Sequence, residues 1–172
     1  MKKTAVKLVA LVVTGLLLLS GCGKTNPNIA ATVGSEQVSV ATVDAVAKVI
    51  AANSPESPNW GGWRAPVVQV IVVSRIGAMV KQQAGITITD IQRQQVYSSN
   101  ALYAALAKDP ASKAFMSDFA DATLMLNDSN LAALFAQVAP TVPVTVNPVF
   151  GEWDPAKVAL TGETGSLSKT LS

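Results

Sequence analysis

The stretch that decides the fold is VVQVIVVSRIGAMVK, which runs from Val67 to Lys81. Six of its first seven residues are valine or isoleucine, so composition alone also fits a buried strand. The apolar pattern continues at helical spacing to Val80, with Pro66 in the first turn and Gly85 as a C-terminal stop. We therefore predict a helix from Ala65 to Ala84, which is apolar on most faces and so central and buried.

A helix is also predicted before this central segment. Ser39 is a suitable N-cap, and Val38 and Val43 have the spacing of a hydrophobic staple. Apolar residues then follow at helical spacing as far as Ile50, and the helix should end near Asn53. The prolines and glycines from Ser54 to Arg64 predict a loop before the central helix.

Four further helices are predicted after the central one. Thr89 and Gln92 form a capping box, so a helix starts at Asp90 and breaks near Ser98–Asn100, and another short helix reaches Lys108. Asp109 followed by proline predicts the next helix start. Its predicted apolar stripe consists of Phe115, Phe119, Ala122 and Leu126. A last helix follows Asn127–Asp128 and stops at Pro140.

Two short strands are predicted near the ends of the helical region. Ile29–Val33 alternates as a half-buried strand does, and Gly34–Ser35 turns it. Thr141–Val146 places three valines on one face and Pro143 on the other, which restricts it to a sheet edge, where it can pair with Ile29–Val33. The predicted fold class is mainly α: a single helical domain of about five to six helices, with a small two-stranded sheet that joins its N- and C-terminal segments.

The N-terminus has the pattern of a bacterial lipoprotein signal. Residues 1–21 combine three lysines, a twelve-residue apolar run and a small-residue exit, which is too short for a membrane span. Cys22 follows Leu-Ser-Gly, as in a lipobox, where its thiolate accepts a diacylglyceryl group. We therefore expect a lipid anchor at Cys22 on the extracytoplasmic face of the cell membrane, where two acyl chains hold stably.

The predicted signal and anchor divide the rest of the chain. Residues 22–28 should be a lipid-anchored tether, 29–155 the helical domain, and 156–172 a disordered tail that is rich in Gly, Ser and Thr. Because Cys22 is the only cysteine, the domain should contain no disulfide.

The charge of the chain does not indicate a nucleic-acid partner. The whole chain has 13 Lys and Arg against 11 Asp and Glu. Loss of the signal would remove three lysines, which leaves ten basic against eleven acidic side chains and a net charge of −1. The basic balance of the whole chain is therefore no argument for nucleic acid or anionic lipid.

The residue inventory argues against an enzyme. With no histidine and one acylated cysteine, the usual zinc and transition-metal sites, the Ser-His-Asp triad and the Cys-His pair are excluded, and no metal or cofactor is expected. Carboxylates remain as candidates. Asp118 and Asp121 share a helix face, and Glu152 and Asp154 lie close in sequence, but such acids usually form a solvated surface.

The aromatic residues are the candidate binding residues. Trp60 and Trp63 stand in the Trp-Gly-Gly-Trp segment of the predicted loop, where they could form an exposed patch that binds unfolded chains or could fold back over the central helix. We favour the second arrangement. Phe150 and Trp153 lie in VNPVFGEWDP, from Val146 to Pro155, and should fold back onto the helices. Three methionines, Met79, Met116 and Met125, are predicted to fill the core.

Three segments resemble the SurA/PrsA-type extracytoplasmic chaperone domain. AATVGSEQVSVATVDAVAKVI, from Ala30 to Ile50, is similar to the family's opening strand and helix, although Gly34–Ser35 replaces the usual Asn-Gly. KQQAGITITDIQRQ, from Lys81 to Gln94, resembles its link between helices. VNPVFGEWDP resembles a segment of short, lipid-anchored members, although Val149 stands where they carry a basic residue.

The resemblance implies a helical domain that holds unfolded or secreted polypeptides near the membrane. Longer members add a parvulin prolyl-isomerase domain, for which this chain has no room after Val146, so isomerase activity is not expected. Two rival hypotheses remain. One is a structural or adaptor lipoprotein that docks on one specific envelope partner, and the other is an enzyme that uses the four carboxylates.

Overall fold

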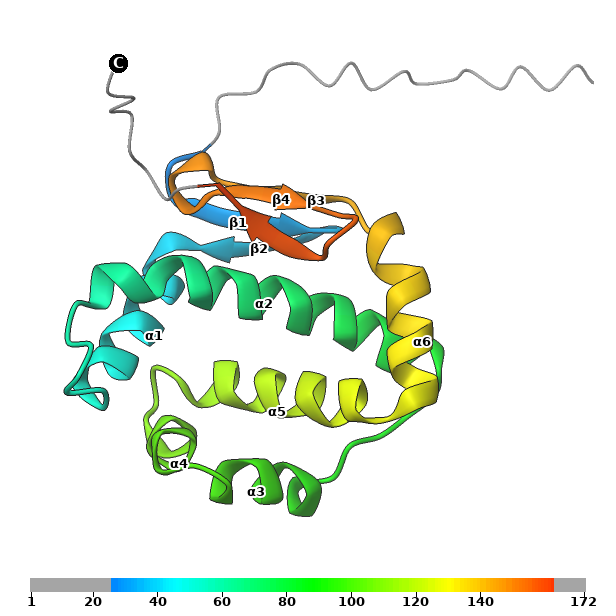
Figure 1. The fold of residues 1–172 in the computed structure, drawn as a ribbon, viewed down its shortest axis with the longest axis horizontal. Coiled ribbons are helices and arrows are strands. Elements are labelled where there is room, and N and C mark those ends of the chain that lie inside the picture. The colour runs from blue at the N-terminus through cyan, green and yellow to red at the C-terminus, as the bar shows by residue number, and fades with distance from the viewer. Residues whose placement is uncertain (1–25, 163–172) are drawn as a thin grey trace, which may run out of the picture.

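The computed structural model describes residues 26–162, so the signal segment, Cys22 and residues 163–172 lie outside the described part. This part is mainly α, as predicted, with six α-helices and five short strands (Figure 1). The helices are α1 (Val40–Ala52), α2 (Trp60–Gln83), α3 (Asp90–Ser98), α4 (Ala101–Lys108), α5 (Lys113–Asn127) and α6 (Ser129–Val138). The strands are β1 (Ile29–Val33), β2 (Glu36–Ser39), β3 (Val144–Val146), β4 (Glu152–Asp154) and β5 (Ala159–Thr161), and 3-10 turns span Ala139–Thr141 and Pro148–Phe150.

Helix α2 is the centre of the domain. It packs against α1, α5, α6 and β1, and Figure 1 shows the strands on one side of it and α3, α4 and α5 on the other. Val67, Val68, Val72, Ile76 and Val80 are buried along it. Its length and composition alone would also suit a membrane span. The prediction of a buried central helix rather than a strand is thus confirmed.

The start of α2 was predicted wrongly. The helix begins at Trp60, so the Trp-Gly-Gly-Trp segment is its first turn rather than a loop, and Pro66 lies in its second turn. The side chain of Asn59 caps this turn by accepting a hydrogen bond from the Gly61 N–H at 3.1 Å. This cap and the packing of Trp63 on the core offset the low helix propensity of the two glycines.

The predicted strand pairing is confirmed. β1 and β3 are antiparallel, with Ala31 opposite Val146 and Val33 opposite Val144, so the two ends of the domain meet in one sheet. The sheet also contains β2, in the order β2-β1-β3. A two-residue turn joins β1 to β2, and Gly34 adopts a φ of +59° there. The strand β2 escaped prediction because Val38 is its single apolar residue.

The predicted disordered tail is wrong as far as Gly162, while residues 163–172 lie outside the described part. Strands β4 and β5 form an antiparallel ribbon in which Trp153 lies opposite Leu160. Gln69 on α2 holds this ribbon, because its amide donates to the Val158 carbonyl at 3.0 Å and accepts from the Leu160 N–H. Composition predicted disorder, but pairing and a tertiary contact from α2 order the segment.

Helix α5 starts later than predicted and buries a different stripe. Asp109–Pro110 forms a turn, and α5 begins at Lys113, after the buried Ser112, whose hydroxyl donates to the Leu106 carbonyl at 2.8 Å. The buried residues of α5 are Met116, Ala120, Ala122 and Met125, whereas Leu126 is exposed and Phe115 and Phe119 are half-buried. The prediction that methionines fill the core is confirmed for Met116 and Met125, and Met79 packs against that core.

The predicted start of α3 is confirmed, and it provides a first test. Thr89 accepts a hydrogen bond from the Gln92 N–H, and the Gln92 side chain accepts one from the Thr89 N–H at 2.8 Å. We expect Thr89→Ala to lower the free energy of unfolding by about 1 kcal/mol, because the hydroxyl accepts from the Gln92 N–H and also donates to the Gln92 side chain. Denaturant unfolding measures the change, and Thr89→Ser should restore stability. An unchanged midpoint for Thr89→Ala would contradict the role of the cap.

Candidate functional site

An apolar groove lies between α1, α2, α4 and α5. Its volume is about 220 Å³, and its lining is almost wholly apolar. The residues that line it are Ile50, Trp63, Pro66, Val67, Val70, Leu102, Tyr103, Leu106, Phe115, Met116 and Phe119. Several of these side chains, including Val70, Leu102 and Phe115, are only half-buried, so part of the apolar surface faces solvent.

The groove follows from the way α5 packs. Because Met116 and Ala120 form the seam of α5 against the core, Phe115 and Phe119 are displaced to the rim of the helix. The Phe119 ring lies against Tyr103 of α4, with 5.1 Å between ring centroids and 60° between ring planes. Phe119 and Tyr103 therefore form an aromatic wall of the groove, because their rings pack against each other.

Trp63 forms the end of this groove nearest the start of α2. Its ring is half-buried against the core, and its Nε1–H donates to the Ser57 carbonyl at 2.9 Å. The favoured prediction that this tryptophan folds back onto the domain is therefore confirmed. The hydrogen bond to the preceding loop fixes the ring at the groove wall.

Trp60 and Phe150 both lie near the Arg64 guanidinium. The Arg64 guanidinium carbon is 5.8 Å from the Trp60 ring centroid and 4.8 Å from that of Phe150, and its Nε donates to Asp44 at 2.7 Å. Phe150 is buried, as predicted, whereas 38% of Trp60 is exposed. Of the two rings, only Trp60 is accessible to a partner, so the predicted folding back of Trp60 is wrong. The reason is that Trp60 starts the helix at its edge, where the ring meets the cations of Lys48, 5.1 Å from its centroid, and Arg64 rather than the apolar core.

Trp153 lies apart from the other three aromatic residues, beside the sheet. Its ring is half-buried against the core, and it lines a cavity between β3 and the β4–β5 ribbon. Its indole N–H is buried and has no hydrogen-bond partner within residues 26–162. The four aromatic residues predicted as binding residues therefore form three sites: Trp63 in the groove, Trp60 and Phe150 around Arg64, and Trp153 beside the sheet.

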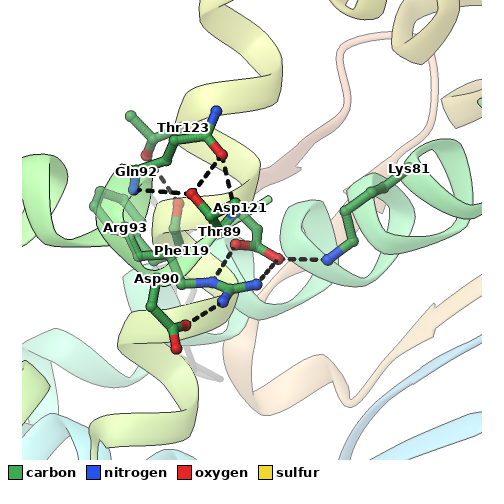
Figure 2. Close-up of polar contacts among 8 residues, drawn as sticks. All are labelled: Lys81, Thr89, Asp90, Gln92, Arg93, Phe119, Asp121 and Thr123. Carbon is green, nitrogen blue, oxygen red and sulfur yellow. Dashed lines mark hydrogen bonds and ion pairs between the residues drawn. The ribbon is translucent and has the colours of Figure 1, made fainter. Parts of the chain in front are cut away.

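Asp121, one of the two carboxylate candidates on α5, is held between two cations. Asp121 accepts hydrogen bonds from Arg93 at 2.6 and 3.1 Å and from Lys81, and so joins α3 and α2 to α5 (Figure 2). Burial would raise the pKa of Asp121, but the hydrogen bonds from the two cations outweigh burial and lower it. Asp121 is thus a fixed anion between two cations, and the prediction of a solvated face is wrong for it, because the side chain is only 14% exposed.

The remaining candidate acids lie on two elements: Asp118 on α5, and Glu152 and Asp154 on β4. Burial raises the pKa of Asp118, and the charge of Arg75, 3.6 Å away, opposes this only in part. A hydrogen bond from Lys157 lowers the pKa of Asp154, and Glu152 is exposed on the same strand. Within residues 26–162, no group of three or more cysteine or carboxylate side chains is placed to hold a metal ion.

The groove itself was missed by residue-by-residue prediction. Tyr103 and Leu102 stand on a short helix with no long apolar stripe, and Phe115 and Phe119 were assigned to the core. The available signal was the presence of two adjacent apolar stripes on α5. Phe115 and Phe119 have helical spacing, and so do Met116 and Ala120 one residue further on, but only one of the two pairs can form the seam against α2. Comparisons with protein-family models, with curated proteins and with solved structures found no match to the chain.

Proposed function

We propose that this protein is a membrane-anchored, extracytoplasmic, chaperone-like lipoprotein that binds unfolded or secreted polypeptides without enzymatic activity. The observation that carries the proposal is the apolar, half-open groove between α1, α2, α4 and α5. The lipid anchor expected at Cys22 and the resemblance of the sequence to SurA/PrsA-type domains support a location at which secreted chains emerge. Both belong to the proposal.

The groove suits one or two apolar side chains of a longer polypeptide. Its volume of about 220 Å³ lies below the roughly 300–1,000 Å³ of pockets that enclose a drug-sized ligand. Its lining offers almost no hydrogen-bonding group that could select a particular polar ligand. An unfolded chain supplies many apolar side chains and requires no such selection, so the groove favours it over a small-molecule substrate.

The carboxylates give the groove no catalytic chemistry. Asp121 is committed to Arg93 and Lys81, on the part of α5 that lies beyond Phe119 from the groove. None of the groove residues is an acid or a base other than Tyr103. A general acid or base must lie within hydrogen-bond reach of its substrate, and this arrangement favours binding over catalysis.

The groove proposal predicts a specific loss of client binding. We expect the double variant Val70→Gln with Leu102→Gln to suppress client aggregation at least tenfold less effectively, because each polar amide removes apolar contact area worth about 1–2 kcal/mol from the bound state. Both side chains are only half-buried in the free protein, so the fold should tolerate the change. Light scattering of a denatured secreted enzyme diluted into residues 23–172 measures the effect.

Ile91→Gln is the matched control. Ile91 is 78% exposed on α3 and lies outside the groove, so this change removes exposed apolar surface without touching the site. Equal loss in the control and in the groove variant would contradict the proposal. A photo-crosslinking residue in place of Leu102 then separates the adaptor hypothesis, because a chaperone captures many secreted chains and an adaptor captures a single stoichiometric partner.

A further inference from the structure

Strand β3 has one edge that forms no hydrogen bonds within the described part of the chain, although β4 lies near it. It is the last strand in the order β2-β1-β3, and it pairs only with β1. Asn147, which follows the strand, donates its N–H to the Ala30 carbonyl at 2.8 Å. Thr145 lies opposite Thr32 in the same register, so its main-chain groups also face β1.

The backbone N–H and C=O groups of Val144 and Val146 face away from β1. Because backbone groups of successive residues point to opposite sides of a strand, Val144 and Val146 direct their N–H and C=O groups away from β1. No hydrogen bond within residues 26–162 uses these four groups. Pro143 does not block this edge, since its carbonyl accepts from Gly34 at 2.9 Å and its missing N–H therefore falls on the side of β1.

A cavity of about 550 Å³ adjoins this edge. It is lined by Val144–Val146 and Pro148, by Gly151–Trp153 and by Thr161 and Gly162 at the end of the β4–β5 ribbon. The volume lies within the range of pockets that enclose a ligand. Trp153 also lines this cavity, but its indole N–H is buried and so is not presented to it. The cavity thus provides space beside the unpaired edge of β3.

We propose that the β3 edge binds an extended segment of a client polypeptide, which adds a strand beside Val144–Val146. An extended main chain is the chemistry that matches alternating N–H and C=O groups spaced along a strand. The client's backbone is held at β3, so main-chain pairing supplies affinity that does not depend on the client's sequence. The inference rests on the proposed function, because its occupant is the client.

The test uses the unaltered protein and altered peptides. The probe is a fluorescein-labelled peptide of alternating valine and threonine with terminal lysines, and its binding to residues 23–172 is followed by fluorescence anisotropy. Two further peptides carry N-methyl groups on alternate residues, one on the odd and one on the even set. Strand addition predicts that one set weakens binding at least tenfold and the other leaves it unchanged, because only one set of N–H groups faces β3.

A variant of the protein tests the same pairing from the side of β3. Val144→Pro removes an outward N–H without touching a bond to β1, and it should weaken binding of the unmodified peptide at least tenfold. Thermal unfolding checks that the variant remains folded, and the N-methyl peptides decide the matter if it does not. The groove variant Val70→Gln with Leu102→Gln should bind this short peptide as the unaltered protein does.

Each other result overturns the inference. Equal binding of both N-methyl peptides would exclude main-chain pairing. Binding that appears only after removal of residues 163–172 would assign the edge to the chain's own C-terminal segment, and binding that is lost in favour of dimers would assign it to a second copy. If the protein does not bind the peptide but still suppresses client aggregation, strand addition at β3 is refuted and the proposed function is not. If the protein binds the peptide but does not suppress client aggregation, the proposed function is refuted instead.

Discussion

Phe150→Ala should lower the free energy of unfolding by about 3–5 kcal/mol, the cost of removing a fully buried aromatic ring. Phe150 is 2% exposed, belongs to the main core and lies against α2. Its ring also faces the Arg64 guanidinium, whose carbon is 4.8 Å from the ring centroid, so the change removes a cation–π contact. Urea unfolding followed by circular dichroism measures the loss.

The neighbouring residue is the control for this prediction. Val149 is 45% exposed in the same 3-10 turn, and Val149→Ala should change the free energy of unfolding by about 0.5 kcal/mol or less. A loss of less than about 1 kcal/mol for Phe150→Ala would mean that the ring is not part of the core in solution. The attachment of the C-terminal segment to α2 would then need another explanation.

Asp121→Asn should lower the free energy of unfolding by roughly 2–3 kcal/mol at neutral pH. The change leaves the charges of Arg93 and Lys81 without their shared anion, and removing one partner of a buried ion pair costs more than the pair contributes. The expected value lies below that of a fully buried pair because the cations are 19% and 27% exposed. Asp90→Asn, which removes the 98% exposed partner of Arg93, should cost much less.

The same variant predicts a pH dependence. The pKa of Asp121 is lowered in the folded protein, so its contribution is complete above the ordinary pKa of an aspartate, about 3.9, and is lost as the pH falls through the folded value. The difference in unfolding free energy between the unaltered protein and Asp121→Asn should therefore be constant from neutral pH to about pH 5 and shrink in acid. Denaturant unfolding across this range measures it. A difference that grew in acid would contradict the lowered pKa.

Local sequence signals correctly predicted those ends of helices that depend on one or two neighbouring side chains. The Thr89–Gln92 capping box starts α3 where predicted, and Gly85 with φ of +66° follows the end of α2. The Asp109–Pro110 signal was wrong, because the buried hydroxyl of Ser112 holds that segment as a turn. A hydrogen bond to a residue six positions earlier thus replaced the helix start that Asp-Pro favours.

The candidate site depended more strongly on contacts between elements. Trp63 lines the groove as one of eleven residues from four helices, and no pattern within one helix indicates which others it will meet. The ordered β4–β5 ribbon likewise depends on Gln69, the lone polar residue of an apolar run. Such residues are visible in a sequence, but their partners are not.

The sequence by itself determined that the domain is mainly α, that α2 is its central helix, and that β1 and β3 join its two ends. Each of these follows from apolar periodicity and end signals, which act over one turn or one strand. Only the tertiary structure decided which face of α5 is buried, where the apolar groove opens and which edge of β3 stays free. These depend on how helices compete for the same surface of α2, and that competition is settled by packing between residues far apart in the chain.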